Sequence, residues 1–192
     1  MQPFLHDRVN RFEALLESST SAMRAYVGND LGYADVVGDH LDGAADAYRQ
    51  MSSPDAENAL RALAAELAAA RRGVDAPSAT RVETRRREFE RSVALRSLLA
   101  AGERLRDDLG AAQRSLTEAR EQLAPVVVFA LDHGLMPAGF GAPTQDELEK
   151  LWQAILQRPE SRGTAQMLAM RLSQPDLVLL LADLLVSAGV RA

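Results

Sequence analysis

A stretch of 45 residues without proline, from 80 to 124, constrains the fold of this chain more than any other feature. Thr80 and Glu83 form a T-x-x-E capping box at its start, and Pro125 follows its end. An unbroken helix over this stretch would be about 68 Å long at 1.5 Å per residue. The chain has 192 residues, and a compact domain of that size has a radius of gyration of only about 16 Å. The helix must therefore project, bend or be surrounded by other helices.

Apolar residues at helical spacing predict three further helices before the long one, at about 4–27, 31–51 and 54–72. Ser53 and Pro54 suit the start of the third, because a serine caps free N–H groups and a proline needs no partner there. The first helix carries the apolar stripe Leu5, Val9, Phe12, Leu16, Ser19, Met23 and Tyr26. We expect these three helices to pack antiparallel against the first half of the long helix.

The apolar positions of the long helix change phase along its length. Phe89 and Val93 do not share a stripe with the later apolar positions. The later set is Leu105, Leu109, Ala112, Leu116, Ala119, Leu123 and Val126. This set follows a heptad pattern, which is typical of a coiled coil. We therefore expect C-terminal helices to cover this half, or the heptad at 105–126 to protrude and pair with another chain.

The C-terminal part is expected to form a small helical subdomain. After Pro125, the segment "VVVFALDHGL" predicts a short helix or a kinked continuation of the long one. Thr144 and Glu147 form a second capping box, which opens a helix that Pro159 stops. Two more helices are expected at about 164–172 and 174–188, with Ser173 and Asp176 capping the second. The sequence thus predicts an all-α fold: an antiparallel helical bundle with one long central helix (about 80–124) over residues 1–133, a Gly/Pro loop at 134–143, and the C-terminal helical subdomain at 144–192.

Composition narrows the class of protein further. Cysteine is absent, which excludes disulfides, thiolate metal sites and a cysteine nucleophile. Lys150 is the only lysine among 22 basic residues, and with the many alanines this indicates a GC-rich, bacterial genome. The N-terminus has no apolar signal region, and the most apolar run, Pro175 to Val190, is too short to span a bilayer. We therefore expect a cytoplasmic protein without a membrane span, or one that is exported by a route that leaves no such signal.

The segment from Tyr33 to Met51 places four carboxylates near His40: Asp35, Asp39, Asp42 and Asp46. At about 100° per residue the four carboxylates fall on one side of a helix, opposite its apolar stripe. His40 lies at the edge of the apolar stripe, away from them. The sequence thus favours a solvated acidic surface stripe, with an arginine-rich partner as the functional alternative. Gly38 and Gly43 weaken this helix and indicate close packing.

No pattern of catalytic or metal-binding residues stands out. None of His6, His40 and His133 follows a carboxylate by three residues, as the ligands of di-iron bundles do. H-E-x-x-H, G-x-S-x-G and phosphate-binding glycine loops are also absent. We expect no enzyme, no cofactor and no metal. The alternative is a small-molecule- or metal-binding bundle, in which Asp39, His40, Asp132 and His133 meet across helices.

A basic segment raises the question of nucleic-acid binding. Its arginines are Arg81, Arg85, Arg86, Arg87 and Arg91. They alternate with Glu83, Glu88 and Glu90, which is typical of a salt-bridged helix surface. The net charge of −5 also argues against broad binding to nucleic acid. A helical nucleic-acid-binding regulator is therefore the third hypothesis.

The last predicted helix is apolar on all sides and must be buried in its own core or against another chain. With the heptads and the missing catalytic pattern, it favours a non-enzymatic protein–protein interaction protein: an adaptor, chaperone or structural subunit of a larger bacterial assembly. The partner would be another protein or a second copy in a homo-oligomer. The partner-interface candidates are Leu105, Leu109, Leu116, Leu123, Met136, Phe140, Leu177, Leu181 and Leu184.

Overall fold

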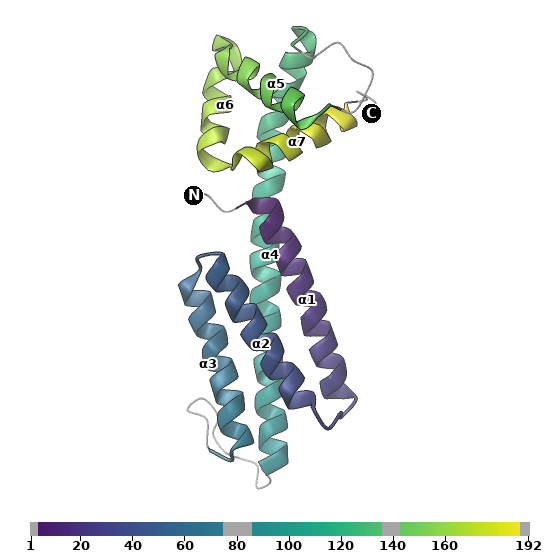
Figure 1. Ribbon diagram of the computed structural model, residues 1–192, viewed down its shortest axis with the longest axis vertical. Helices are drawn as coiled ribbons and strands as arrows, with labels where there is room; N and C mark the ends of the chain where they lie inside the picture. Colours follow the sequence, from purple (N-terminus) through teal and green to yellow (C-terminus); the bar gives the residue numbers. More distant parts are fainter. Residues whose placement is uncertain (1–3, 75–85, 136–142, 189–192) are drawn as a thin grey trace. The chain divides into compact units, whose positions relative to one another are not determined.

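The computed structural model describes residues 4–74, 86–135 and 143–188 (Figure 1). These residues form seven α-helices and no strand, which confirms the all-α prediction. The helices are α1 (Leu5–Val27), α2 (Tyr33–Gln50), α3 (Pro54–Arg71), α4 (Arg86–Asp132), α5 (Gln145–Gln157), α6 (Pro159–Arg171) and α7 (Gln174–Ser187). No described helix is both long enough and apolar enough to cross a membrane.

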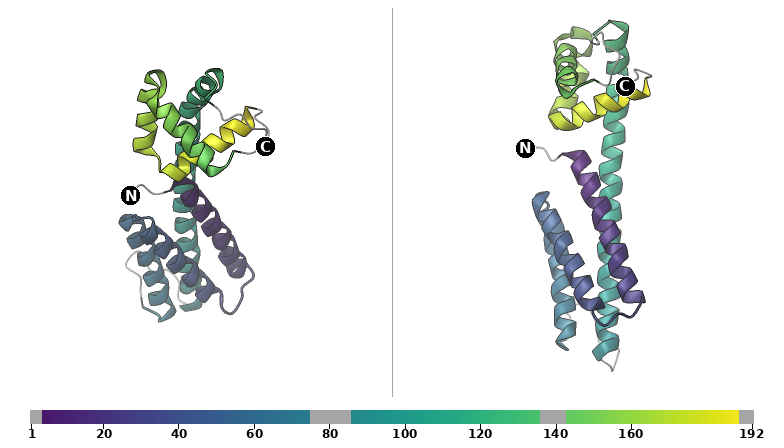
Figure 2. Two further views of the ribbon diagram at one scale, coloured as in Figure 1. Left: turned by 45° about the horizontal axis from the view of Figure 1, so that its top comes forward. Right: turned by 45° about the vertical axis from the view of Figure 1, so that its right-hand side comes forward.

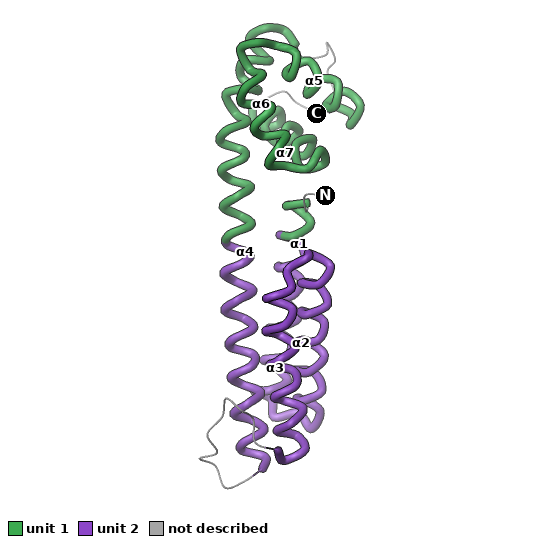
Figure 3. The backbone as a smooth tube through the Cα atoms, turned by 90° about the vertical axis from the view of Figure 1, so that its left-hand side faces the viewer, with its two compact units in different colours: residues 1–8, 111–192 green, residues 9–110 purple. Residues whose placement is uncertain are grey.

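The chain divides into two compact units (Figure 3). Unit 1 comprises residues 1–8 and 111–192, and unit 2 comprises residues 9–110. Both α1 and α4 therefore contribute residues to each unit. The division falls inside α4, whereas the loop expected at 134–143 lies within unit 1 and mostly outside the described residues.

The central helix differs from the predicted one at its C-terminal end. α4 continues through Pro125 to Asp132, so the expected end at 124 is wrong, and residues 125–132 continue the long helix rather than form a separate short one. Pro125 cannot donate a backbone hydrogen bond, which normally disrupts a helix interior. Here the residues on both sides of it, Leu123, Val126 and Val127, are buried and hold this part of α4 in the core of unit 1. Thr80 and Glu83 lie outside the described residues.

Capping residues predict four helix starts, and the three that lie among the described residues have different outcomes. Thr144 and Glu147 form the expected reciprocal capping box. Ser173 accepts a hydrogen bond from the backbone N–H of Asp176, as expected for an N-cap. Ser53 precedes Pro54 at the start of α3, but its hydroxyl does not form the capping hydrogen bond. α6 also begins at Pro159, five residues before the expected start, because Pro159 ends α5 and occupies the first turn of α6.

Unit 2 is a four-helix bundle of α1, α2, α3 and the first part of α4, which lie side by side in both views of Figure 2. Consecutive helices alternate in direction, so α1 and α3 run antiparallel to α4 as expected, whereas α2 runs parallel to it, which corrects the expectation that all three would be antiparallel. On α4, Arg91 contacts α1, Glu90 contacts α2 and Arg96 contacts α3. Because three helices surround this part of α4, it buries a wide sector. This wide buried sector explains why the apolar positions of α4 shift from one side of the helix to another between Val93 and Leu105.

Unit 1 packs α5, α6 and α7 with the second part of α4. Its buried core is Ala119, Leu123, Val126, Val127, Ala130, Leu148, Leu151, Trp152, Ile155, Ala165, Leu168, Leu172, Leu177, Leu180, Leu181 and Leu185. Between α6 and α5, the Ser161 hydroxyl donates to the carbonyl of Ile155 at 2.8 Å. One side of α7 therefore belongs to the core of unit 1, but Leu179 (42% exposed) and Val186 (60% exposed) lie at the surface, so α7 is not buried on all sides within this chain as expected.

Candidate functional site

The acidic stripe on α2 lies next to arginines of α3. Asp35 is 2.7 Å from Arg71, and Asp46 is 2.8 Å from Arg61. Arg61 also lies 3.9 Å from Asp42. The stripe therefore meets arginines of its own chain, and these ion pairs are largely exposed to solvent. Gly38 and Gly43 are not sites of close packing, because a Cβ added at either would meet no atom within 4 Å.

His40 is buried in unit 2 rather than placed among these carboxylates. Its Nδ1 atom lies 3.1 Å from the hydroxyl of Ser18 on α1. Its Nε2 atom is buried and has no hydrogen-bond partner among the described residues. Burial lowers the pKa of the His40 imidazole, so the neutral form is favoured. A neutral histidine bonded to a serine fits a core position better than an acid–base site.

The other two histidines are also engaged within the chain. His6 lies 2.8 Å from the buried carboxylate of Asp176. The ring of His133 stacks on Phe129, with centroids 4.0 Å apart. Across the described residues, no three His, Asp or Glu side chains are grouped so that they could hold a metal ion.

Two tyrosines of α2 bond to carboxylates of α4. Tyr33 donates to Glu90 at 3.4 Å, and Tyr48 donates to Asp108. Burial, together with Glu90, raises the pKa of Tyr33 to about 12. Burial and Asp108 likewise raise the pKa of Tyr48. Both phenols are thus held in the protonated form, in which they tie α2 to α4.

Two of the three described arginines of the basic segment, Arg86 and Arg91, make contacts inside unit 2. Arg86 donates to the carbonyl of Arg71, and Arg91 donates to the side chain of Asn29. The guanidinium of Arg91 also lies 4.7 Å from the ring centroid of Tyr26. Arg81 and Arg85 lie outside the described residues. Arg86 and Arg91 thus connect helices of the bundle.

Most of the predicted partner-interface leucines belong to the cores. Four of them are buried and are therefore not available to a partner in this conformation: Leu105, Leu123, Leu177 and Leu181. Leu109, Leu116 and Leu184 are half-buried. Met136 and Phe140 lie outside the described residues. The helical spacing of the leucines indicates a buried apolar stripe. Such a stripe can lie in the core of one chain or in an interface between chains, and the spacing does not distinguish the two.

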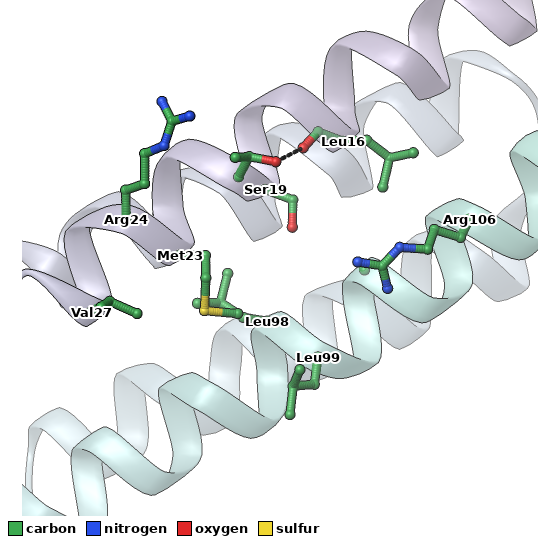
Figure 4. Close-up of a pocket in the computed structure, with 10 residues that line it drawn as sticks. Leu16, Ser19, Met23, Arg24, Val27, Leu98, Leu99 and Arg106 are labelled. Carbon is green, nitrogen blue, oxygen red and sulfur yellow. Dashed lines mark hydrogen bonds between the residues drawn. The ribbon is translucent and has the colours of Figure 1, made fainter.

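A groove lies between α1 and α4 in unit 2, and we call it the α1/α4 groove (Figure 4). Its volume is about 490 Å³. It is lined by Leu16, Ser19, Thr20, Met23, Arg24 and Val27 of α1 and by Leu98, Leu99, Gly102 and Arg106 of α4. In Figure 4, Met23 points across the groove toward Leu98. Five of the ten lining residues have apolar side chains and four have polar or charged ones. Ligand-binding sites likewise combine apolar surface with polar groups.

The groove forms because the apolar stripe of α1 is wider than the surface that the bundle covers. Phe12 and Ala22 of α1 are fully buried, whereas Leu16 and Met23 remain half-buried. On the α4 side, Leu98 is buried but the neighbouring Leu99 is 50% exposed. Gly102 has no side chain, and a Cβ added there would lie 3.8 Å from both Ser19 and Arg106. The absence of a side chain at Gly102 therefore helps to keep the groove open.

All charged side chains that line the groove are cationic. Arg24 and Arg106 belong to its lining, which contains no carboxylate. Neither guanidinium forms an ion pair or a hydrogen bond within the described part of the chain. Figure 4 shows Arg106 extending from α4 toward Ser19 of α1. The groove therefore combines apolar surface with two available cations in a chain whose net charge is −5.

In comparisons with known proteins, no family model, no curated protein and no solved structure matches this chain.

Proposed function

We propose that this chain is a non-enzymatic interaction protein, an adaptor, chaperone or structural subunit of a larger assembly, and that it binds a partner through the α1/α4 groove. The observation that carries the proposal is the open apolar groove whose two arginines have no partner in the described residues. A bacterial source and a cytoplasmic location, both expected from the sequence, belong to the same proposal.

The exposed apolar side chains of the groove support binding rather than chemistry. Leu99 is 50% exposed and Val27 is 71% exposed, and both would be covered by a partner. Fully burying an exposed Leu or Val side chain is worth about 1.5–3 kcal/mol before the costs of association, so covering the exposed half of Leu99 contributes about half of that. The described histidines and tyrosines, in contrast, are engaged in contacts within the chain. The groove lacks a nucleophile paired with a base, which an acyl- or group-transfer enzyme needs.

Affinity purification of the tagged protein from its native cells, with two matched variants, tests this proposal. Leu99→Glu places a charge in the groove, and Leu179→Glu places the same charge at a 42% exposed position of α7 in unit 1. We expect a partner that the wild type and Leu179→Glu both recover and that Leu99→Glu loses. Circular dichroism checks that both variants are folded. Recovery of the same proteins by all three, or of none by the wild type, would count against the proposal.

A further inference from the structure

We infer that the occupant of the α1/α4 groove is an amphipathic α-helix of a partner protein, with apolar anchors along one side and carboxylates beside them. This inference rests on the proposed function and names the chemistry of the partner. It follows from the length of the groove, its two helical walls and its charge.

The dimensions of the groove suit a helix of about three turns. Its lining on α1 runs from Leu16 to Val27, which spans about 17 Å along the helix axis at 1.5 Å per residue. A third helix that lies along two packed helices inserts side chains spaced three and four residues apart. Apolar anchors at positions i, i+3 or i+4, i+7 and i+11 would meet Leu16, Met23 and Leu99 along this length.

The charge of the groove selects an acidic helix. Arg24 and Arg106 have no carboxylate beside them in the lining, and both remain available to an incoming anion. Arginine binds carboxylate groups in a two-pronged geometry, which favours glutamate or aspartate at the edges of the incoming helix. Two arginines would also orient that helix, because its acidic positions must face them.

The same charge argues against a second copy of this chain as the occupant. In a symmetric dimer through the groove, the same surface of each copy would face its partner. Arg24 and Arg106 of both copies would then approach each other, and like charges brought together across an interface weaken it. A symmetric dimer would therefore lack the carboxylates that the groove requires.

A display library of 18-residue helical peptides tests the inference without knowledge of the natural partner. Four anchor positions at i, i+4, i+7 and i+11 are limited to Leu, Ile, Met and Phe, and the flanking positions vary among Glu, Gln and Lys. The library is selected on the full chain and, in parallel, on Gly102→Leu, whose added side chain fills the groove. We expect the wild type to enrich Glu over Lys at flanking positions at least fivefold, and Gly102→Leu to lose this enrichment.

The affinity of the best peptide is then measured by fluorescence anisotropy. We expect Arg106→Gln to weaken binding about tenfold and Arg24→Gln to weaken it severalfold, while Arg49→Gln on α2, outside the groove, leaves it unchanged. Raising the salt concentration should weaken wild-type binding. If Gly102→Leu fails to fold, Leu99→Glu replaces it as the blocked variant.

Several results would overturn the inference. Enrichment of Lys, no preference between Glu and Lys, or no enriched helix would each contradict it. If the peptide occupies the groove, we expect laurate to displace it. If laurate binds but no peptide does, the occupant is a small anionic amphiphile and the inference is wrong. Concentration-dependent self-association abolished by Leu99→Glu would indicate a second copy. If the cellular partner is still lost in Leu99→Glu while the library shows no acidic preference, the proposed function stands and only this inference fails.

Discussion

Asp176 and His6 are 170 positions apart in the sequence, yet Nδ1 of His6 lies 2.8 Å from Oδ1 of Asp176. The same carboxylate accepts hydrogen bonds from the backbone N–H groups of Leu5 at 2.9 Å and His6 at 3.1 Å. The hydroxyl of Ser173 donates to it as well, at 2.7 Å. Asp176 is fully buried and thus serves as the cap that the start of α1 requires. This contact fastens the beginning of the chain to α7 within unit 1.

Replacing Asp176 should destabilise unit 1. Asp176→Ala leaves the backbone N–H groups of Leu5 and His6 without their acceptor, and we expect the free energy of unfolding to fall by about 2–3 kcal/mol. Urea denaturation with hydrogen exchange on unit 1 measures the change. The matched control is Asp183→Ala, an exposed carboxylate of the same helix, which should change the stability little. Equal effects of the two substitutions would show that the Asp176 contacts contribute nothing special.

Acid should weaken the contacts of Asp176, because they depend on its ionised carboxylate. Burial raises the pKa of Asp176, but the hydrogen bonds from His6, Leu5 and Ser173 outweigh it and hold this pKa below its ordinary value. A carboxyl with a lower pKa in the folded state contributes stability above its unfolded pKa, near 3.9, and that stability is lost as the pH falls through the folded pKa. The wild type should therefore lose stability more steeply below about pH 4 than Asp176→Ala. Parallel curves for the two proteins in that range would refute the assignment.

His40 should produce a separate pH dependence at higher pH. Burial lowers its pKa in the folded state, so the unfolded chain takes up the proton first as the pH falls below about 6.5. The free energy of unfolding of unit 2 should therefore decrease from about pH 6.5 downward. His40→Gln cannot titrate and can still bond to Ser18, so its stability should be flatter over this range. Thermal unfolding at several pH values measures both proteins, and identical slopes would exclude His40 as the cause.

Substitutions at three helical glycines should distinguish effects on the stability of unit 2 from effects on partner binding. Gly38→Ala and Gly43→Ala add a methyl group where no atom lies within 4 Å, and each should stabilise unit 2 by about 0.5–1 kcal/mol through helix propensity. Gly102→Ala should give a similar gain, because its Cβ would meet Ser19 and Arg106 at an ordinary contact distance of 3.8 Å. Gly102→Ala should also narrow the groove and weaken partner binding. Gly38→Ala and Gly43→Ala should leave partner binding unchanged. Thermal unfolding and anisotropy with the selected peptide measure the two effects, and equal binding by all three variants would contradict the role given to Gly102.

Local rules predicted most of the fold because helix periodicity and capping are encoded by near neighbours. Thr144 with Glu147 and Ser173 with Asp176 act within one turn, and the structure forms both caps. Pro125 was misread because its effect depends on tertiary packing, which here keeps α4 helical on both sides of it. The start of α6 was missed because Pro159 was treated only as a stop. A proline also suits a first helical turn.

The candidate site was less accessible to sequence reasoning. Leu16, Ser19 and Met23 were correctly placed on the apolar stripe of α1, but periodicity does not reveal which part of a stripe the other helices leave uncovered. Leu99 lies beside the buried Leu98 and outside the heptad set, so it carried no signal. The pairing of His6 with Asp176 joins the two ends of the chain, and only the folded arrangement brings them together. The sequence signal for Arg106 is its position one helical turn after Gly102.

The central claim is that a partner helix occupies the α1/α4 groove, and methyl NMR tests it most directly. The protein is labelled at Leu, Val and Met methyl groups and titrated with the best acidic peptide from the library. We expect the largest shifts at Leu16, Met23, Val27, Leu98 and Leu99, with little change at Leu179 and Val186 of α7. Shifts confined to α7, or spread evenly over both units, would contradict the claim.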